Sequence, residues 1–311
     1  MGNYPLEQLK NIVPSDRLFF NEPMSAHTSF KIGGPADAFI YAEETEIINS
    51  VFDFADENGI PVTVIGNGTN LLVSDAGIEG IVLAIKSINQ SYVFTPDSET
   101  EEGVFVNVSA GTLLSSFAKT AAKAGFSGTE PLAGIPGSVG GAVAMNAGAY
   151  GGEIKDIIYS AQVLDKEHNI ITLSAEELEL EYRNSAVLKN GYIVLSAKFF
   201  LKRGNAEESL AKIADFNGRR RDKQPLEYPS AGSTFKRPTG YFAGKLIEDA
   251  GLRGFSVGGA QVSEKHCGFV INKDGADCKE VCKLIEKVKR RVFENSGVTL
   301  EPEVRILGRK M

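Results

Sequence analysis

The feature that most constrains this chain is the run from Leu132 to Gly151, LAGIPGSVGGAVAMNAGAYG, which holds six glycines and no charged residue. Such a run is neither an ordinary amphipathic helix nor a solvated linker. Glycine permits positive φ and lets another group approach the backbone closely, at an entropic cost. The run therefore predicts a large anionic ligand that lies against main-chain N–H groups.

The composition is typical of a soluble globular protein. The 311 residues suffice for two or three domains, and 42% hydrophobic and 23% charged residues are ordinary values. The net charge of −7 disfavours partners such as nucleic acid or an anionic membrane, so anionic ligands have to meet local clusters of cations. Because no signal-like N-terminus and no apolar stretch of membrane-spanning length occur, we expect a cytoplasmic protein, a monomer or a weak oligomer.

Neither the cysteines nor the histidines have the spacing of a metal site. The chain holds three of each: Cys267, Cys278, Cys282, His27, His168 and His266. Cys278 and Cys282 lie one helical turn apart and could form half of a site, but a second ligand pair is missing. We expect reduced thiols and no metal, and we interpret His266 as a structural histidine.

Apolar periodicity, caps and turn residues predict strands and helices in alternation. Thr112 and Asn205 are expected helix caps, Ser174 with Glu177 is a capping-box pattern that opens a short helix, and 95–102 is expected to be a polar surface connection. The expected helices span 47–55 (ending at Gly59), 112–125, 206–223, 241–250 and 277–295; the expected strands span 60–66, 80–87, 103–111, 160–165, 169–174, 191–202, the neighbourhoods of 257 and 269, and 298–308.

This order has no regular βαβ rhythm, so the sequence predicts an α+β fold. A GxGxxG directly between a strand and a helix is missing, which disfavours a Rossmann domain. We expect one subdomain over 1–94, a second over 95–204 and a separate domain over 205–301, with a last strand in 302–311 that returns to the first subdomain.

Three glycine-containing segments offer donors to a phosphate group: GNGTN (66–70), GIPGSVGG (134–141) and NAGAYGG (146–152). Any one of them alone is more typical of a tight turn. Together they favour a bound diphosphate cofactor, held by convergent N–H groups and polar side chains. The candidate cofactor-binding residues are Gly66, Asn67, Gly68, Thr69, Asn70, Leu71, Gly134, Pro136, Gly137, Ser138, Gly141 and Asn146.

The ordered set of motifs resembles the UDP-N-acetylenolpyruvoylglucosamine reductase (MurB) family. The motifs are GNGTNLLVSD, GIPGSVGGAVAMNAGAYGGE, EYRNS, AGSTFKRP and LEPEVRILG, and the resemblance covers roughly Thr28 to Gly308. It implies an FAD-binding fold of the vanillyl-alcohol-oxidase (PCMH) type with a separate substrate domain. The implied reaction is the NADPH-dependent reduction of UDP-N-acetylglucosamine enolpyruvate to UDP-N-acetylmuramate, for peptidoglycan.

The resemblance also implies the catalytic residues. Ser233 in AGSTF matches the family's proton donor, and Arg183 and Glu303 match the groups that stabilise the negatively charged intermediate. Taken alone, each has an ordinary interpretation: a loop serine, a surface ion pair between Arg183 and Glu181, and a strand glutamate.

A basic cluster, which also includes Arg220, supplies the candidate substrate-binding residues: Arg219, Lys223, Lys236 and Arg237. Recognition of the UDP diphosphate and a solvated helix end are equally good interpretations. Many family members carry Asn where Arg237 stands. Only NSAVLKNG follows Arg183 before the next strand, so the chain resembles the shorter branch of the family, which lacks an inserted loop with a substrate-covering Tyr.

Two other functions stay open from the residues. One is an oxidase of alcohols or sugars on the same flavin fold, which would return electrons to oxygen. The other is a carrier that binds flavin or a nucleotide sugar without catalysis.

Overall fold

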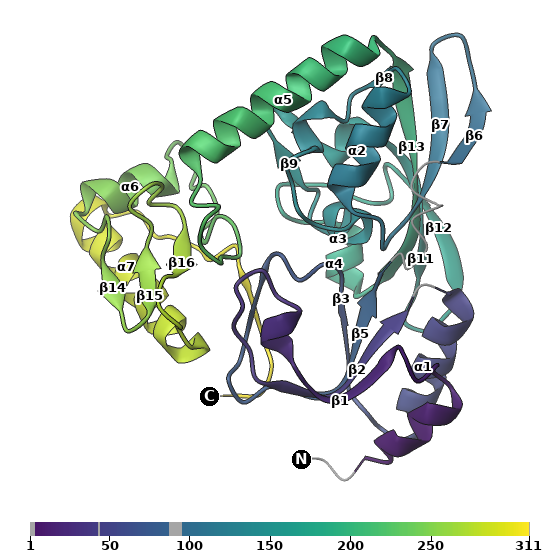
Figure 1. The fold of residues 1–311 in the computed structure, drawn as a ribbon, viewed down its shortest axis with the longest axis horizontal. Helices are drawn as coiled ribbons and strands as arrows, with labels where there is room; N and C mark the ends of the chain where they lie inside the picture. The colour runs from purple at the N-terminus through teal and green to yellow at the C-terminus, as the bar shows by residue number, and fades with distance from the viewer. Residues whose placement is uncertain (1–3, 43, 87–94, 311) are drawn as a thin grey trace.

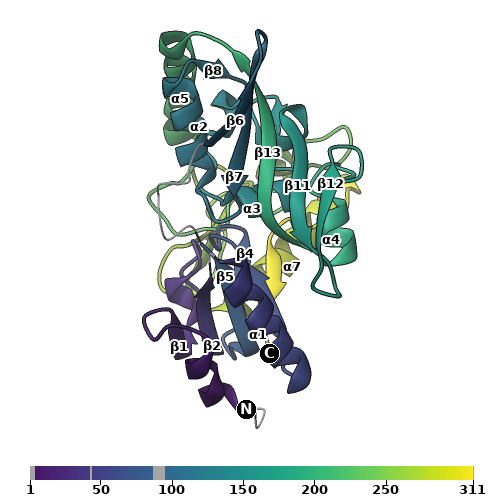
Figure 2. The same cartoon turned by 90° about the vertical axis from the view of Figure 1, so that its right-hand side faces the viewer.

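The computed structural model describes residues 4–42, 44–86 and 95–310. Figure 1 shows two β-sheets and a C-terminal unit, which the long helix α5 connects to the second sheet. In Figure 2, the second sheet lies above the first. The predicted boundary at residue 94 and Ser87, the last residue of a predicted strand, lie outside the described residues.

The first sheet has the strand order β1-β2-β5-β3, with β2, β5 and β3 parallel and β1 antiparallel to β2. Alternate residues of β2 and β5 face opposite sides: Ile40 and Leu83 pack with α1, whereas Phe39 and Val82 belong to a separate cluster. The elements are η1 (Leu6–Asn11), β1 (Leu18–Pro23), η2 (Met24–Ala26), β2 (Pro35–Ala42), α1 (Thr45–Glu57), β3 (Val62–Ile65), β4 (Leu71–Val73) and β5 (Ile78–Ile85).

The second sheet is antiparallel, in the order β12-β11-β13-β7-β6, and its apolar face continues the core that packs against α1. The predicted hairpin of β11 and β12 is confirmed. The strands are β6 (Thr95–Glu99), β7 (Gly103–Ser109), β8 (Phe126–Ser127), β11 (Ile158–Leu164), β12 (Ile170–Ser174) and β13 (Ile193–Arg203), with β8 paired to the end of β13.

Two predictions about this sheet were wrong. Residues 95–99 form the edge strand β6, not a surface connection, because an edge strand with exposed side chains such as Asp97 needs no apolar pattern. Ser174 and Glu177 make both capping-box hydrogen bonds, of 2.8 and 3.3 Å, yet residues 175–179 are a single turn. Glu179 has a left-handed φ of 44°, which ends the helical path.

Thr112 was also wrongly predicted as a cap. Helix α2 (Leu114–Lys123) begins after Leu113, and the buried Thr112 hydroxyl has no hydrogen-bond partner among the described residues. The Thr112 carbonyl instead accepts the N–H of Val139, 2.8 Å away in the glycine run. The run and its flanking residues form η4 (Glu130–Leu132), α3 (Val139–Ala144), β9 (Gly148–Ala149), β10 (Gly152–Glu153) and η5 (Ile154–Asp156); α4 (Ala186–Asn190) follows before β13.

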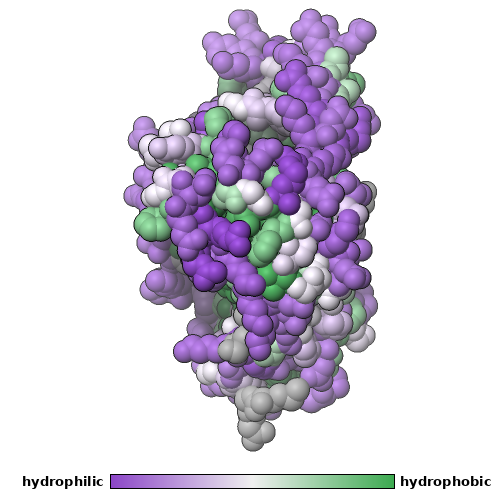
Figure 3. Space-filling model, turned by 90° about the vertical axis from the view of Figure 1, so that its left-hand side faces the viewer, coloured by the Kyte–Doolittle hydropathy of each residue, from purple (hydrophilic) through white to green (hydrophobic). Residues whose placement is uncertain are grey.

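Helix α5 (Ala206–Lys223) leads from the second sheet to the C-terminal unit (Figure 1). Its predicted cap is confirmed, since Asn205 Oδ1 accepts the N–H groups of Glu207 and Glu208 at 2.9 and 3.1 Å. The C-terminal unit has a three-stranded sheet packed on α7 and a hydrophilic surface with a smaller hydrophobic area (Figure 3). Its elements are α6 (Ala243–Asp249), β14 (Ser256–Val257), β15 (Ala260–Val262), β16 (Val270–Asn272) and α7 (Cys278–Ser296).

The end of the chain returns to the first unit. Strand β17 (Arg305–Leu307) pairs in parallel with β4. It spans three residues and is therefore shorter than the predicted 298–308. Arg309 then binds both carboxylate oxygens of the buried Asp37 at 2.7 Å. Within the described ranges, no helix combines the length and the apolar character that crossing a bilayer requires.

Candidate active site

A cleft of about 1100 Å³ lies where the two sheets and the C-terminal unit meet. All predicted cofactor-binding residues except Asn146 line it: Gly66, Asn67, Gly68, Thr69, Asn70, Leu71, Gly134, Pro136, Gly137, Ser138 and Gly141. The same cleft holds Arg183, Ser233 and Glu303. Segments far apart in the chain therefore converge on one site.

The first glycine loop, residues 66–70, connects β3 to β4. Within the described chain, the backbone N–H groups of residues 67–70 donate no hydrogen bond to another residue. Gly68 has φ 64°, and a Cβ there would overlap the carbonyl oxygen of His27. The Asn67 side chain donates to the carbonyl of Pro136 at 2.7 Å, which joins this loop to the glycine run.

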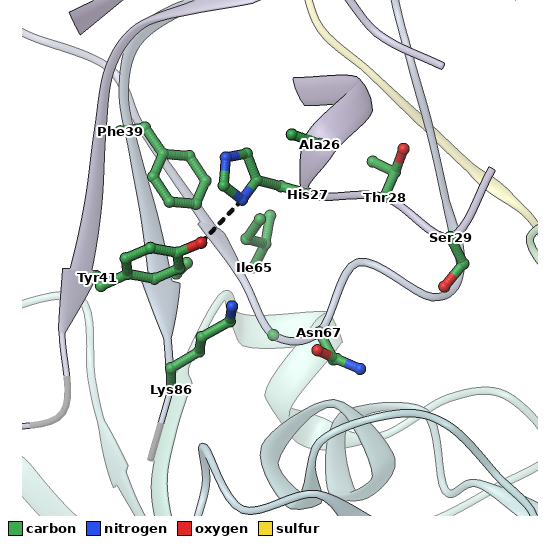
Figure 4. A pocket seen from close by; sticks show the side chains of 11 residues that line it. Ala26, His27, Thr28, Ser29, Phe39, Tyr41, Ile65, Asn67 and Lys86 are labelled. Atoms are coloured by element: carbon green, nitrogen blue, oxygen red, sulfur yellow. Dashed lines mark hydrogen bonds between the residues drawn. The ribbon is translucent and has the colours of Figure 1, made fainter. Parts of the chain in front are cut away.

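The His27 segment supports this loop from its other side, beside a small pocket of about 250 Å³ (Figure 4). The His27 ring stacks on Phe39 with centroids 3.9 Å apart, and its nitrogens lie 2.7 Å from Glu22 and 3.0 Å from the Tyr41 hydroxyl. Two residues later, the N–H of Ser29 donates to the carbonyl of Gly68 at 3.1 Å. His27 is thus a packed structural residue.

The glycine run forms the opposite wall of the cleft. Ser138 Oγ accepts the N–H of Gly141 at 3.3 Å and caps α3, while the N–H groups of Gly137 and Ser138 have no acceptor in the described part of the chain. A Cβ on Gly66 would overlap Ser138 Oγ, so the two loops pack too closely for a side chain. Unpaired N–H groups from both loops therefore face one cavity, the arrangement that a diphosphate requires.

Asn146 lies behind this wall. It is fully buried, and its amide donates to Glu153 and to the carbonyl of Glu181 at 3.0 and 3.2 Å. Its Oδ1 accepts the N–H of Lys155 at 3.0 Å. Every polar group of the side chain is engaged within the protein, so Asn146 holds the end of the glycine run in place and is not available to a ligand.

Arg183 and Glu303, which are 120 positions apart, form an ion pair in the cleft, with Arg183 Nε 2.6 Å from Glu303 Oε1. The surface pair with Glu181 that the sequence left open is not formed. Both side chains are largely buried, at 19% and 13% exposure. The two terminal amino groups of Arg183 have no hydrogen bond to other described residues, so they remain available to an anion.

Ser233 is exposed in the cleft and is positioned by its neighbour. The carbonyl of Thr234 accepts the N–H of Glu303 at 2.8 Å, and the Thr234 hydroxyl accepts the N–H of Val270 at 2.8 Å. The Asn70 amide donates to the Glu303 carbonyl at 3.2 Å. These bonds tie the first glycine loop, the Ser233 segment and the Glu303 segment together.

The four predicted substrate-binding cations lie outside the lining of the cleft. Arg219 pairs with Asp215 one turn earlier on α5, at 2.7 Å, and Lys236 pairs with Glu301 at 3.2 Å. The guanidinium of Arg237 lies 4.0 Å from the ring centroid of Phe242. Lys223, at the end of α5, is exposed.

The neighbouring Arg220, which belongs to the same basic cluster but was not among the candidate substrate-binding residues, does line the cleft. Its Nη1 is buried without a partner among the described residues, and burial lowers the pKa of its guanidinium. A Cβ on Gly134 would lie 2.5 Å from this Nη1, so the Arg220 side chain occupies the space that the glycine leaves. Helical spacing could have identified Arg220, because it follows the buried Ile213 by seven residues and thus shares its face.

No cluster of three metal-ligating side chains occurs in the described ranges, and the cysteines are free thiols. His266 is partly buried, and this burial lowers the pKa of its imidazole. Its Nδ1 accepts the N–H of Gly268 at 3.1 Å, as expected of a structural histidine.

The comparisons with known proteins agree with this geometry. Residues 36–174 match the model of an FAD binding domain, and residues 224–307 match that of the UDP-N-acetylenolpyruvoylglucosamine reductase C-terminal domain. A UDP-N-acetylenolpyruvoylglucosamine reductase of Lachnoclostridium phytofermentans is 57% identical over 311 residues, with 100% of this chain and 99% of the relative covered. The chain belongs to the UDP-N-acetylenolpyruvoylglucosamine reductase family.

Other members show how much of the fold is shared. The enzyme named so in Clostridium novyi is 51% identical over 97% of this chain and 96% of its own length. A crystal structure of MurB from Thermus caldophilus aligns with a TM-score of 0.76 at 35% identity, covering 93% of this chain and 97% of that one. The predicted α+β FAD-binding fold with a separate C-terminal domain is confirmed, and the chain is an FAD-dependent reductase.

Proposed function

We propose that this enzyme uses NADPH to reduce bound FAD and then reduces the enolpyruvyl group of UDP-N-acetylglucosamine enolpyruvate, giving UDP-N-acetylmuramate for peptidoglycan in the cytoplasm. The observation that carries the proposal is the Arg183–Glu303 pair beside Ser233, in a cleft walled by two glycine loops. The family relationship supplies the substrate and the reaction.

The cleft fits FAD on three counts. N–H groups of residues 67–70, 137 and 138 that donate to no other described residue face it, Arg220 brings a cation whose buried Nη1 has no partner among those residues, and Ile135 and Val194 add apolar lining. Amides and a guanidinium suit the diphosphate, and apolar side chains suit the rings. When bound, FAD supplies the hydride that it has received from NADPH.

Arg183 and Glu303 bind and orient the substrate in this proposal. Arg183 holds the substrate carboxylate with its two free amino groups, while Glu303 holds the other edge of the guanidinium. As hydride reaches the β-carbon, negative charge grows on the carboxylate side. Because the pair is largely buried, its fixed positive edge stabilises that charge more strongly than water would.

Ser233 donates a proton to the α-carbon as the hydride adds to the β-carbon, so that the double bond gains two hydrogens and becomes a single bond. A serine hydroxyl is a weak acid, and it serves here because the carbanion-like α-carbon is strongly basic. The hydroxyl then regains its proton from water.

We further propose that Arg219, Lys223, Lys236 and Arg237 contribute positive charge around the substrate diphosphate. In this division, subdomains 1–94 and 95–204 hold FAD together with Arg220 of α5, the rest of domain 205–301 holds the nucleotide sugar, and 302–311 returns to the first subdomain. The protein acts as a monomer or a weak oligomer.

Anaerobic spectroscopy tests the proposal. The purified protein should be yellow, lose its visible absorption with NADPH and regain it with UDP-N-acetylglucosamine enolpyruvate. Ser233→Ala should keep flavin reduction by NADPH and lose nearly all reoxidation by the substrate, whereas equal loss in both steps would refute the proton-donor role. Rapid reoxidation by oxygen alone would indicate an oxidase, and bound flavin without NADPH consumption would indicate a carrier.

A further inference from the structure

We propose that Tyr182 is a positioning residue that fixes Arg183 against Glu303 and holds the Ser233 segment at the correct distance from this pair. The inference rests on the proposed function for its kinetic consequence. Its structural basis is that the exposed Tyr182 contacts two different parts of the molecule: its ring contacts the Arg183 guanidinium, and its hydroxyl accepts the backbone N–H of Arg237.

Tyr182 and Arg183 form the tip of a tight reverse turn. Glu181 and Asn184 exchange both backbone hydrogen bonds, at 3.1 and 3.2 Å, which leaves two residues to reverse the chain. Arg183 adopts a φ of 56°, a left-handed conformation that is unusual for a non-glycine residue. Such strain persists only where surrounding contacts hold it, so the contacts of this turn have functional weight.

The ring of Tyr182 provides the first contact. The Arg183 guanidinium carbon lies 4.9 Å from the ring centroid, within cation–π range. Glu303 bonds only Nε of Arg183, and one hydrogen bond leaves the guanidinium plane free to rotate. The ring beneath removes that freedom, so the two terminal amino groups face a substrate carboxylate in one orientation.

The hydroxyl of Tyr182 provides the second contact. It accepts the backbone N–H of Arg237 at 3.1 Å, four residues beyond Ser233 in the C-terminal unit. The Arg237 side chain is directed elsewhere, over the Phe242 ring, so the bond does not depend on it. Tyr182 thus connects the segment that carries the proton donor to the turn that carries Arg183.

The test compares Tyr182→Phe, which removes only the hydroxyl bond, with Tyr182→Leu, which also removes the ring under Arg183. Tyr159→Phe is the matched control, because Tyr159 is similarly exposed, at 54% against 48%, and does not line the cleft. Stopped-flow absorption at saturating substrate measures flavin reduction by NADPH and flavin reoxidation by the nucleotide separately, and titration of the oxidised enzyme gives substrate Kd.

We expect the reoxidation rate constant to fall about 2- to 10-fold in Tyr182→Phe, the loss of one ordinary hydrogen bond, and about 10- to 100-fold in Tyr182→Leu. Flavin reduction, flavin content and substrate Kd should stay within about 2-fold of the parent, as should every value of Tyr159→Phe. Parallel loss in both half-reactions, or no loss in Tyr182→Leu, would overturn the proposal.

A stability measurement tests the Tyr182–Arg183 contact without any substrate. Thermal unfolding of the holoenzyme is compared for Tyr182→Leu, Arg183→Gln and the double variant. Coupled residues should show a double variant less destabilised than the sum of the single variants. Strict additivity would refute the Tyr182–Arg183 contact. A parent enzyme that the enolpyruvyl nucleotide fails to reoxidise would instead refute the proposed function, and this cycle would still report on Tyr182.

Discussion

Replacing Gly68 with alanine tests whether packing against the His27 segment shapes the first glycine loop. A Cβ on Gly68 would overlap the His27 carbonyl oxygen and lie 3.1 Å from its carbonyl carbon and 3.2 Å from Thr28 Cα. All three atoms are backbone, so no side-chain rotation relieves the overlap. Gly59 is the matched control, because its φ of 62° is nearly the same as the 64° of Gly68 and a Cβ there meets nothing within 4 Å.

The two variants separate backbone strain from overlap. A left-handed conformation costs an L-residue roughly 1–2 kcal/mol, which is the full loss expected for Gly59→Ala. Overpacking adds about 1–3 kcal/mol, so Gly68→Ala should lose about 2–5 kcal/mol in total. Gly68→Ala should also weaken FAD binding, because the loop moves together with its unpaired N–H groups.

Urea unfolding of the flavin-free protein, followed by circular dichroism, measures the first effect. Quenching of flavin fluorescence during titration with FAD measures the second. If Gly68→Ala is no more destabilised than Gly59→Ala and binds FAD equally well, then the close approach to His27 does not shape the loop, and the reasoning is wrong.

Three further predictions follow from the site. Glu303→Gln should slow flavin reoxidation by the substrate about 100-fold and leave reduction by NADPH intact, because Arg183 loses its charged partner; equal slowing of both steps in stopped-flow traces would contradict this. Arg220→Met should keep or raise the melting temperature of the flavin-free protein, because a buried Nη1 without a partner among the described residues is removed, yet weaken FAD binding about 10- to 100-fold; unchanged affinity by titration would exclude Arg220 as an anion ligand. Since burial lowers the pKa of folded His266, the unfolded state binds an extra proton below about pH 6.5 and stability falls as the pH drops; His266→Gln should reduce this decline in unfolding curves from pH 7 to 5, and an identical decline would contradict it.

Local chemistry was enough to predict most elements of the fold. The Asn205 cap, the left-handed Gly59 after α1 and the alternation in the β11–β12 hairpin each depend on neighbours within a few residues. The errors have a common cause. Whether residues 95–99 extend as an edge strand, or whether the helix begins at Thr112, depends on segments that are distant in the sequence.

The candidate site, like the fold, was predicted in part from the sequence. Glycine content identified the two loops, and the motif order identified the family that the comparisons confirm. Residue type alone does not distinguish Arg220, whose side chain reaches the cleft, from Arg219, which pairs with Asp215 at the surface; only their different positions around the helix do. Asn146 looked like a phosphate donor until its amide was found fully engaged with Glu153 and the backbone.

The sequence by itself determined where the backbone lacks side chains and which reactive groups the chain carries, since both are properties of single residues. Only the tertiary structure decided which N–H groups stay unpaired in the cleft, and that Arg183 meets Glu303 beside Ser233. The physical reason is that the atoms next to a group in space decide whether a donor stays unpaired and whether an ion pair forms. In the cleft of this molecule, Asn70 and the carbonyl of Glu303 meet although they are 233 positions apart.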